Sequence, residues 1–202
     1  MKNIINLISI LLLVIFSLAY LLKLYILRKK YNINGNVLAN KNKNRKAQLV
    51  EKTLQIATSI WLIILIGEIV SSLLSIDNRL RLWNNYFISI CGLFVIAIGV
   101  LFFTIAALTM KSSWRVGIDK STKSKLITEG IYKYSRNPAF TGFYLIFIGV
   151  FIVYADVIIC ASMVINIYAM NKLVLEEEKH LEGMFGEEYS NYKQKTPRYL
   201  LW

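Results

Sequence analysis

Cysteine and histidine are both scarce in this chain of 202 residues, and their scarcity removes several classes of site. The two cysteines, Cys91 and Cys160, lie in apolar stretches, where we interpret them as small apolar side chains facing lipid or a neighbouring helix. Two such residues provide neither a disulfide framework nor the spacing of a zinc site. The single histidine, His180, is interpreted as an exposed position in a charged helical tail rather than as a general base. No metal site is therefore expected.

Acidic residues are also few: 12 Asp and Glu stand against 24 Lys and Arg, which gives a formal net charge of +12. The charges concentrate between long apolar blocks, whereas a basic soluble protein would spread them over its surface. The hydrophobic fraction of 56% and the mean hydropathy of +0.50 are too high for an ordinary soluble domain. Interleaved aromatic residues are lacking in the basic segment 28–52, so we expect a solvated loop near anionic lipid headgroups and no nucleic-acid partner.

The apolar blocks predict membrane-spanning helices, because backbone groups in lipid must satisfy each other's hydrogen bonds. Three blocks reach the roughly 20 residues that a helix needs to cross a bilayer, and two are shorter. In order they are Ile4–Leu27, Leu54–Ile76, Tyr86–Leu108, Pro138–Tyr154 and Val157–Leu175. The first is longer than a signal-peptide core and is expected to be a retained helix. The predicted fold is all-α: a polytopic membrane bundle of about five transmembrane helices with a C-terminal helical hairpin and a cytosolic tail.

Basic residues alternate between the segments that connect these blocks, and this alternation predicts an orientation. The Lys and Arg counts are eight in 28–52, two in 77–85, seven in 109–137, none in the turn at Asp156 and four in 176–202. We therefore expect the N-terminus outside and the C-terminus in the cytosol, in a bacterial-type inner or plasma membrane. We divide the chain into residues 1–85, the N-terminal helices with the basic loop, and residues 86–202, a core that carries the site.

Two cytosolic segments flank the hairpin, and a site between them would face both water and lipid. In the first segment Gly130 permits a tight turn, and Pro138 fits the first turn of a helix. The free N–H groups of that helix, with Arg136 beside them, are suited to a carboxylate or phosphate. The alternative is a basic interfacial turn with Tyr132 and Tyr134 in the aromatic belt.

The second segment starts with three glutamates at 176–178, which we expect to end the last apolar helix. Carboxylates are mildly unfavourable at that end, so solvent, nearby lysines such as Lys172 and Lys179, or a ligand must compensate. Phe185, Tyr189 and Tyr192 are spaced to share one helical face, which is more typical of packing than of a cofactor site.

Glu68 lies inside the second apolar block, where an ionisable side chain is costly and by default indicates function. We predict that it binds substrate or a lipid headgroup. Helix–helix hydrogen bonding or a protonated carboxyl group is the alternative. Gly67 beside it is expected to let another helix approach closely.

Taken in order, these elements resemble the isoprenylcysteine carboxyl methyltransferases and their bacterial relatives. The family pattern is G-x-Y, then Arg-His-Pro with an aromatic residue two positions later, then Glu-Glu and F-G-x-x-Y around a helical hairpin. Here the corresponding stretches read WRVGI, LITEGIYKYSRNPAFTG, EEE and FGEEYSNY. The resemblance covers roughly residues 100–200 and does not extend to the first two blocks.

The resemblance implies an enzyme that transfers a methyl group from S-adenosylmethionine to a lipidic or lipid-linked acceptor. By position in the family motifs, the cofactor-binding residues would be Lys125, Leu126, Ile127, Tyr132, Asn137, Pro138, Phe140 and Glu177. Arg136 and Glu178 are the candidate catalytic residues, although no dedicated base is evident. Lys172 is the nearest residue to the family's arginine for a substrate carboxylate, which has no clear match, and joins Glu68 as a candidate for substrate binding. The acceptor itself stays open among isoprenylcysteine, a phospholipid amine and small hydrophobic acids or thiols.

One position departs from the family: its histidine is Asn137 here, and the tyrosine that follows is Phe140. An asparagine can donate a hydrogen bond to the cofactor carboxylate, but it cannot titrate near neutral pH. Activity survives this change if the histidine only binds, and suffers if the histidine must carry charge.

Two alternatives come from other classes of protein. Membrane sterol reductases carry a similar Arg-x-Pro turn and an aromatic-rich tail but use NADPH. A non-catalytic membrane scaffold would bind no cofactor at all.

Overall fold

The structure is a computed structural model that describes residues 1–38, 43, 45–76, 80–117 and 125–200. Within these residues the chain forms α-helices and two short 3-10 turns, with no strand. The elements are α1 (Lys2–Tyr31), α2 (Arg45–Leu73), α3 (Tyr86–Thr109), η1 (Lys111–Ser113), η2 (Gly130–Lys133), α4 (Pro138–Tyr154), α5 (Val157–Phe185) and α6 (Glu187–Lys195). Part of the charge count (Lys41, Arg79, Lys120, Lys123) and Ile118 of the WRVGI stretch lie outside the described residues.

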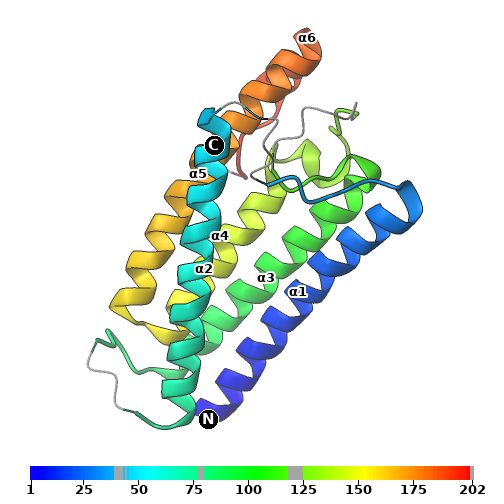
Figure 1. Cartoon of the computed structure of the whole chain (residues 1–202). Coiled ribbons are helices and arrows are strands. Elements are labelled where there is room, and N and C mark those ends of the chain that lie inside the picture. Colours follow the sequence, from blue (N-terminus) through cyan, green and yellow to red (C-terminus); the bar gives the residue numbers. More distant parts are fainter. Residues whose placement is uncertain (39–42, 44, 77–79, 118–124, 201–202) are drawn as a thin grey trace.

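Helices α1 to α5 run side by side along one long axis, and α6 lies beyond one end of the bundle (Figure 1). We call this end the α6 end. Four helices, α1, α2, α3 and α5, are long and apolar enough to cross a membrane. The fifth, α4, has 17 residues, which corresponds to about 26 Å of helix. The predicted fold class is therefore confirmed: the protein is an all-α, multi-pass integral membrane bundle.

The helical hairpin that joins α4 to α5 is the most tightly connected part of the bundle. Ala155 ends α4 in the left-handed conformation, with φ 54°. Asp156 then caps α5, its carboxylate accepting hydrogen bonds from the backbone N–H of Ile158 at 2.7 Å and of Ile159 at 3.0 Å. Two residues thus reverse the chain, as the spacing of the two apolar blocks predicted.

Helices α3 and α4 approach closely because glycines face each other across their interface. A methyl group at Gly99 would lie 2.7 Å from the carbonyl oxygen of Gly142, and one at Gly92 would lie 2.9 Å from that of Gly149. Small residues at such positions let two backbones pack at short range in a bilayer, where no hydrophobic effect drives helices together.

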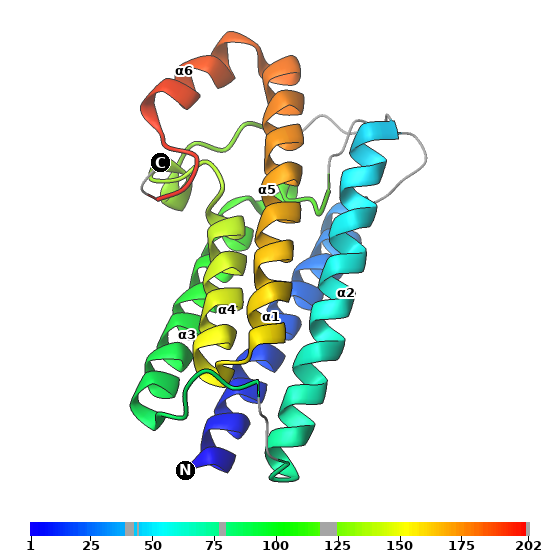
Figure 2. The same ribbon diagram turned by 90° about the vertical axis from the view of Figure 1, so that its left-hand side faces the viewer.

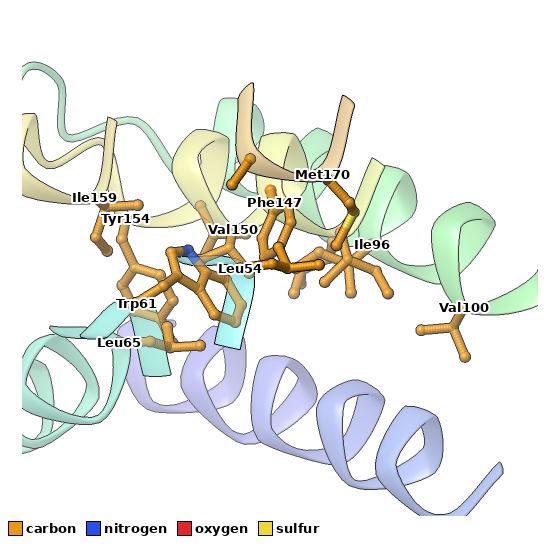
Figure 3. Close-up of a cluster of buried hydrophobic side chains, with 14 of the residues drawn as sticks. Leu54, Trp61, Leu65, Ile96, Val100, Phe147, Val150, Tyr154, Ile159 and Met170 are labelled. Atoms are coloured by element: carbon orange, nitrogen blue, oxygen red, sulfur yellow. The ribbon is translucent and has the colours of Figure 1, made fainter. Parts of the chain in front are cut away.

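The core of the bundle lies where α2, α3, α4 and α5 meet (Figure 3). The indole ring of Trp61 packs edge-on against the Phe147 ring, with 4.8 Å between their centroids. Asn166 of α5 adds polar contacts to α2: its amide donates to the carbonyl of Ala57 at 3.2 Å and accepts from the Thr58 hydroxyl at 3.0 Å. These bonds fix the register of α5 against α2.

Three sequence expectations about the helices are wrong. The glutamates at 176–178 do not end a helix, since α5 continues to Phe185. The stripe Phe185, Tyr189 and Tyr192 does not lie on one helix either, because Gly186, with φ 54°, separates α5 from α6 and α6 turns away from the α5 axis (Figure 2). Outside the backbone of α2 itself, no atom of the described residues approaches within 4 Å of a methyl group placed on Gly67, so none of the helices given above packs closely there.

The basic segment 28–52 is less loop-like than its composition predicts. Helix α1 runs to Tyr31 and α2 begins at Arg45, so both ends of the segment are helical. The part between them pairs with the stretch after η1, since the N–H of Val37 donates to the carbonyl of Val116 at 3.0 Å.

Candidate functional site

Glu178 of α5 gathers three side chains around its carboxylate at the α6 end. One oxygen accepts from Arg136 Nε at 3.1 Å and from Asn137 Nδ2 at 3.1 Å. The other oxygen accepts from Arg198 Nε at 3.0 Å. The side chains of Glu178 and Arg136 are 5% and 7% exposed, so this is a buried ion pair. The pKa of Arg198 is raised, chiefly by its hydrogen bond to Glu178.

The C-terminal segment after α6 folds back over the start of α4. The N–H of Arg136 donates to the carbonyl of Pro197 at 2.9 Å, and that of Asn137 donates to the carbonyl of Arg198 at 3.2 Å. Farther along, the Tyr199 hydroxyl donates to Asn171 Oδ1 of α5 at 2.9 Å. The sequence predicted an anion at the start of α4, and the carboxylate of the protein's own Glu178 lies there. The returning C-terminal segment covers the same helix start.

A narrow cavity of about 120 Å³ lies between this cluster and the end of α3. Every residue that the sequence assigned to cofactor binding lines it except Pro138: Lys125, Leu126, Ile127, Tyr132, Asn137, Phe140 and Glu177. Arg136 lines it as well. Pro138 is buried at the first position of α4, as predicted, and shapes the cavity only through the backbone. The motif residues span 52 positions in the sequence, from Lys125 to Glu177, and the fold brings them together around one cavity.

A wide cavity of about 500 Å³ adjoins the narrow one and extends between the helices. Aromatic and aliphatic side chains from all five long helices line it, among them Phe16, Leu62, Phe103, Phe143 and Met170. The two cavities have six residues in common, which we call the shared wall: Trp114, Arg115, Gly117, Ala139, Phe140 and Glu177.

Glu177 is the acidic residue of the shared wall. Its side chain is partly buried, and among the described residues its carboxylate makes no hydrogen bond or ion pair. Glu178, its neighbour in sequence, is fully engaged with two arginines and Asn137. The pair therefore divides into one carboxylate that holds the site together and one that faces both cavities.

Tyr132 forms part of the cavity floor from the short η2 turn. Its ring is 6% exposed, and burial raises the pKa of its hydroxyl, so the phenol stays neutral. Its backbone carbonyl accepts a hydrogen bond of 2.6 Å from the Tyr192 hydroxyl of α6. Gly130 begins this turn with φ 61°, a left-handed conformation that favours glycine. The tight turn expected at this glycine is present, whereas Tyr134 is exposed.

The structure does not bring Glu68 or Lys172 to these cavities. Glu68 lies at the opposite end of the bundle, where its carboxylate pairs with Arg81 at 3.3 Å. A separate polar cavity of about 460 Å³ surrounds that pair. Lys172 is exposed on α5, with its ammonium group 5.1 Å from the centroid of the Tyr168 ring.

Sequence reasoning missed several residues of the narrow cavity. His180, interpreted as exposed, is partly buried and lines the cavity one turn after Glu177, together with Met184 and Phe185. Arg115 lines the shared wall, with its guanidinium donating to the carbonyls of Ser112 at 2.7 Å and Trp114 at 2.8 Å. The spacing of three residues from Glu177 on a continuous helix was the available signal for His180, whereas the sequence analysis placed His180 at an exposed position in a charged helical tail.

The narrow cavity combines apolar surface with polar groups of both signs, which suits a ligand that has an aromatic part and a charged part. Leu126, Ile127 and Phe140 offer the apolar surface. Glu177 offers a carboxyl group, and Asn137 offers its amide oxygen, since its Nδ2 group already donates to Glu178 and to the carbonyl of Arg198. The wide cavity offers space for an apolar chain. Within the described residues no cluster of His, Cys, Asp and Glu is arranged to hold a metal ion.

The comparisons with known proteins agree with the motifs. The chain is 28% identical over 119 residues to a probable protein-S-isoprenylcysteine O-methyltransferase of Oryza sativa subsp. indica, covering 57% of this chain and 62% of that protein. It is 30% identical over 118 residues to the protein-S-isoprenylcysteine O-methyltransferase of Xenopus laevis, covering 54% of this chain and 39% of that protein. The chain thus spans less than two thirds of the length of these relatives.

A solved structure is similar as well. It is described as the eukaryotic intramembrane Ras methyltransferase ICMT, isoprenylcysteine carboxyl methyltransferase, and superposes with a TM-score of 0.53 at 25% identity. The match covers 70% of this chain and 50% of that structure. The model of the family described as phospholipid methyltransferase matches residues 87–188, half of the chain. The resemblance indicated by the motifs is confirmed, and the protein belongs to the phospholipid methyltransferase family, with isoprenylcysteine methyltransferases among its relatives.

Proposed function

We propose that the protein is an integral membrane methyltransferase that transfers a methyl group from S-adenosylmethionine to a lipidic or lipid-linked acceptor. The observation that carries this proposal is the pair of adjoining cavities. The narrow cavity opens among polar segments at the α6 end, and the wide one lies among the apolar helices. Their shared wall is the place where a water-soluble donor and a membrane-embedded acceptor can meet.

The side chains of the narrow cavity suit S-adenosylmethionine, for which the cavity would widen from its volume of about 120 Å³. Leu126, Ile127 and Phe140 would contact its adenosine part. Asn137 would offer its amide oxygen, because its Nδ2 group already donates to Glu178 and to the carbonyl of Arg198. The Glu177 carboxyl group would accept a hydrogen bond from the ammonium group of the cofactor. When bound, this cofactor supplies an electrophilic methyl group on a positively charged sulfur. Family membership supports the same assignment.

The acceptor would occupy the wide cavity with its apolar chain and present its reactive group at the shared wall. The relatives are named for isoprenylcysteine, whose prenyl chain and carboxylate have the required character. A carboxylate is already ionised near neutral pH and needs no general base. Positioning and exclusion of water could therefore supply most of the acceleration.

We propose that Arg136 and Glu178, predicted from the sequence as catalytic, act by positioning. Each is bonded to the other, and Glu178 also binds Asn137 and Arg198. Their contacts hold the start of α4, helix α5 and the returning C-terminal segment in one arrangement. This leaves Glu177 as the carboxyl group directed at the ligands.

The α6 end would face the cytosol. The basic residues Arg28, Lys29 and Lys30 end α1 there, and the described basic residues around η1 and η2 lie at the same end. This orientation gives the narrow cavity access to a cytosolic cofactor. The division at residue 85 stays a prediction, although α1 and α2 contribute side chains to the wide cavity.

Isothermal titration calorimetry of the detergent-purified protein with S-adenosylhomocysteine tests the proposal. We expect binding in the micromolar range for the wild type and its loss in Glu177→Ala. Glu182→Ala, which changes an exposed carboxylate on the same helix, should bind like the wild type. No binding by demonstrably folded wild-type protein would overturn the proposal, and binding of NADPH in its place would indicate the reductase.

A further inference from the structure

The amino-terminal part of the chain, outside the stretch that the family model matches, closes the α6 end of the wide cavity. Residues 33–38, which leave α1 and cross toward α2 (Figure 1), lie beside residues 114–117. The N–H of Val37 donates to Val116 at 3.0 Å, and the N–H of Val116 donates to the carbonyl of Gly35 at 2.8 Å. We call these two paired segments the roof. Leu38, Val116 and Gly117 of the roof line the wide cavity.

A buried ion pair connects the roof to α2. The ammonium group of Lys43 lies 2.6 and 2.8 Å from the two carboxylate oxygens of Glu51. The same ammonium group donates to the carbonyl of Val37 at 2.6 Å. The side chains are 4% exposed for Lys43 and fully buried for Glu51. One lysine thus links the first roof segment to α2.

Glu51 also touches the second roof segment, at the shared wall. A methyl group placed on Gly117 would lie 2.8 Å from Glu51 Oε1, so the carboxylate rests against the glycine backbone. The φ of Gly117 is 88°, a conformation that other residues rarely adopt. Gly117 lines both cavities, and Glu51 therefore supports the wall at which the donor and the acceptor would meet.

An ion pair is a costly way to fill buried space, because both charges lose their hydration. An ion pair, however, holds its two partners at a defined distance and direction, which an apolar contact does not do. Methyl transfer from a sulfonium is an in-line displacement, and a misplacement of about 1 Å far from the chemistry can cost about 10²-fold in rate. The shared wall is the place where the donor and the acceptor would have to be aligned within such a tolerance.

We infer that Lys43 and Glu51 are positioning residues for methyl transfer, which hold the roof and the shared wall in register with the acceptor in the wide cavity. The inference rests on the proposed function. It makes residues 33–38, Lys43 and the start of α2 part of the working site, in contrast to the division of the chain at residue 85.

Steady-state kinetics of the full chain in lipid nanodiscs test the inference. The probes are N-acetyl-S-farnesylcysteine and phosphatidylethanolamine, and the better of the two is used throughout. In Glu51→Gln we expect kcat/KM for the probe to fall about 10²-fold, because the wall is no longer held in place. The dissociation constant of S-adenosylhomocysteine should stay near the wild-type value. Lys43→Arg, which keeps the pair, should retain most of the wild-type kcat/KM, and Gly117→Ala should lower it.

Two controls separate positioning from simple loss of stability. Glu182→Gln breaks the exposed pair with Lys193, 2.7 Å apart, and should leave kcat/KM unchanged. Should Glu51→Gln not yield folded protein, the double variant Lys43→Met with Glu51→Met leaves no unpaired charge and carries the same measurement. A lower melting temperature with unchanged kcat/KM would overturn the inference while the proposed function stands. Wild-type protein that binds no S-adenosylhomocysteine and methylates neither probe would overturn both.

Discussion

At the scale of single residues, Glu178 holds together the part of the site that comes from distant segments. Arg136 is 42 positions before it and Arg198 is 20 positions after it, and both guanidinium groups reach its carboxylate. Because these charges are buried or partly buried, each depends on the others for compensation.

Replacing Glu178 tests this dependence. We expect Glu178→Ala to lower the free energy of unfolding by about 3 kcal/mol, because it leaves Arg136 buried without its partner. Glu182→Ala, which breaks the exposed pair with Lys193, should cost less than about 1 kcal/mol. Unfolding in mixed micelles with increasing denaturing detergent measures both. Equal losses in the two variants would show that the cluster around Glu178 contributes no more than a surface pair.

The sequence was informative about which residues form the narrow cavity and less informative about what each one does. The G-x-Y turn, Asn137, Phe140 and Glu177 were recognised as parts of one motif, and they lie together. The role of Arg198 was not foreseen, because nothing in the local pattern of the C-terminal segment tells which carboxylate it meets. Glu68 was assigned a function from its cost in lipid alone, and Arg81 offsets that cost.

At the scale of helices, the α3–α4 interface determines where the start of α4 lies, and with it Asn137 and Phe140. The glycines of the interface allow backbone contact: Gly99 and Gly142 each leave no room for a methyl group. Two helices that touch through backbone have little freedom to shift along or away from each other.

A pair of glycine variants tests this close packing. Gly99→Ala should destabilise the bundle by about 1–3 kcal/mol, because its methyl group would lie 2.7 Å from the Gly142 carbonyl oxygen. Gly67→Ala, at a helical position with nothing within 4 Å, should leave stability unchanged or slightly raised. Thermal unfolding in detergent compares them. A similar melting temperature for both variants would contradict the packing described for α3 and α4.

Some helix boundaries can be predicted from the local sequence pattern, and others cannot. The hairpin was predicted to the residue, because only Ala155 and Asp156 separate the two apolar blocks and because Pro138 fits the first turn of a helix. The end of α5 was placed ten residues too early, at Leu175 rather than Phe185, because a change from apolar to charged residues marks the edge of the membrane and not the end of a helix.

At the scale of the whole molecule, the two cavities meet only because five helices and several connecting segments are arranged around them. The wide cavity takes residues from α1 and α2, which carry no recognisable motif. The sequence therefore predicted the bundle and one side of the site, while the cavity between helices depends on long-range packing that no local pattern encodes.

The orientation of the bundle is open to a direct test. In a variant with Cys91 and Cys160 replaced by alanine, single cysteines are introduced as Asn84→Cys and Lys195→Cys. A membrane-impermeant maleimide should label the first in intact cells and the second only after permeabilisation, because the basic α6 end faces the cytosol. Labelling in the reverse order would place the narrow cavity outside the cell and remove its access to the proposed cofactor.

The central claim, that a donor in the narrow cavity and an acceptor in the wide cavity react across the shared wall, is tested most directly by transfer of a labelled methyl group. Purified protein in nanodiscs is incubated with methyl-labelled S-adenosylmethionine and N-acetyl-S-farnesylcysteine or phosphatidylethanolamine, and the label is measured in the organic extract. The account predicts label in the lipid-soluble product with the wild type and a loss of at least about 10²-fold in Glu177→Ala. Wild-type protein that is folded yet transfers no label to either acceptor, or transfer that is undiminished in Glu177→Ala, would contradict it.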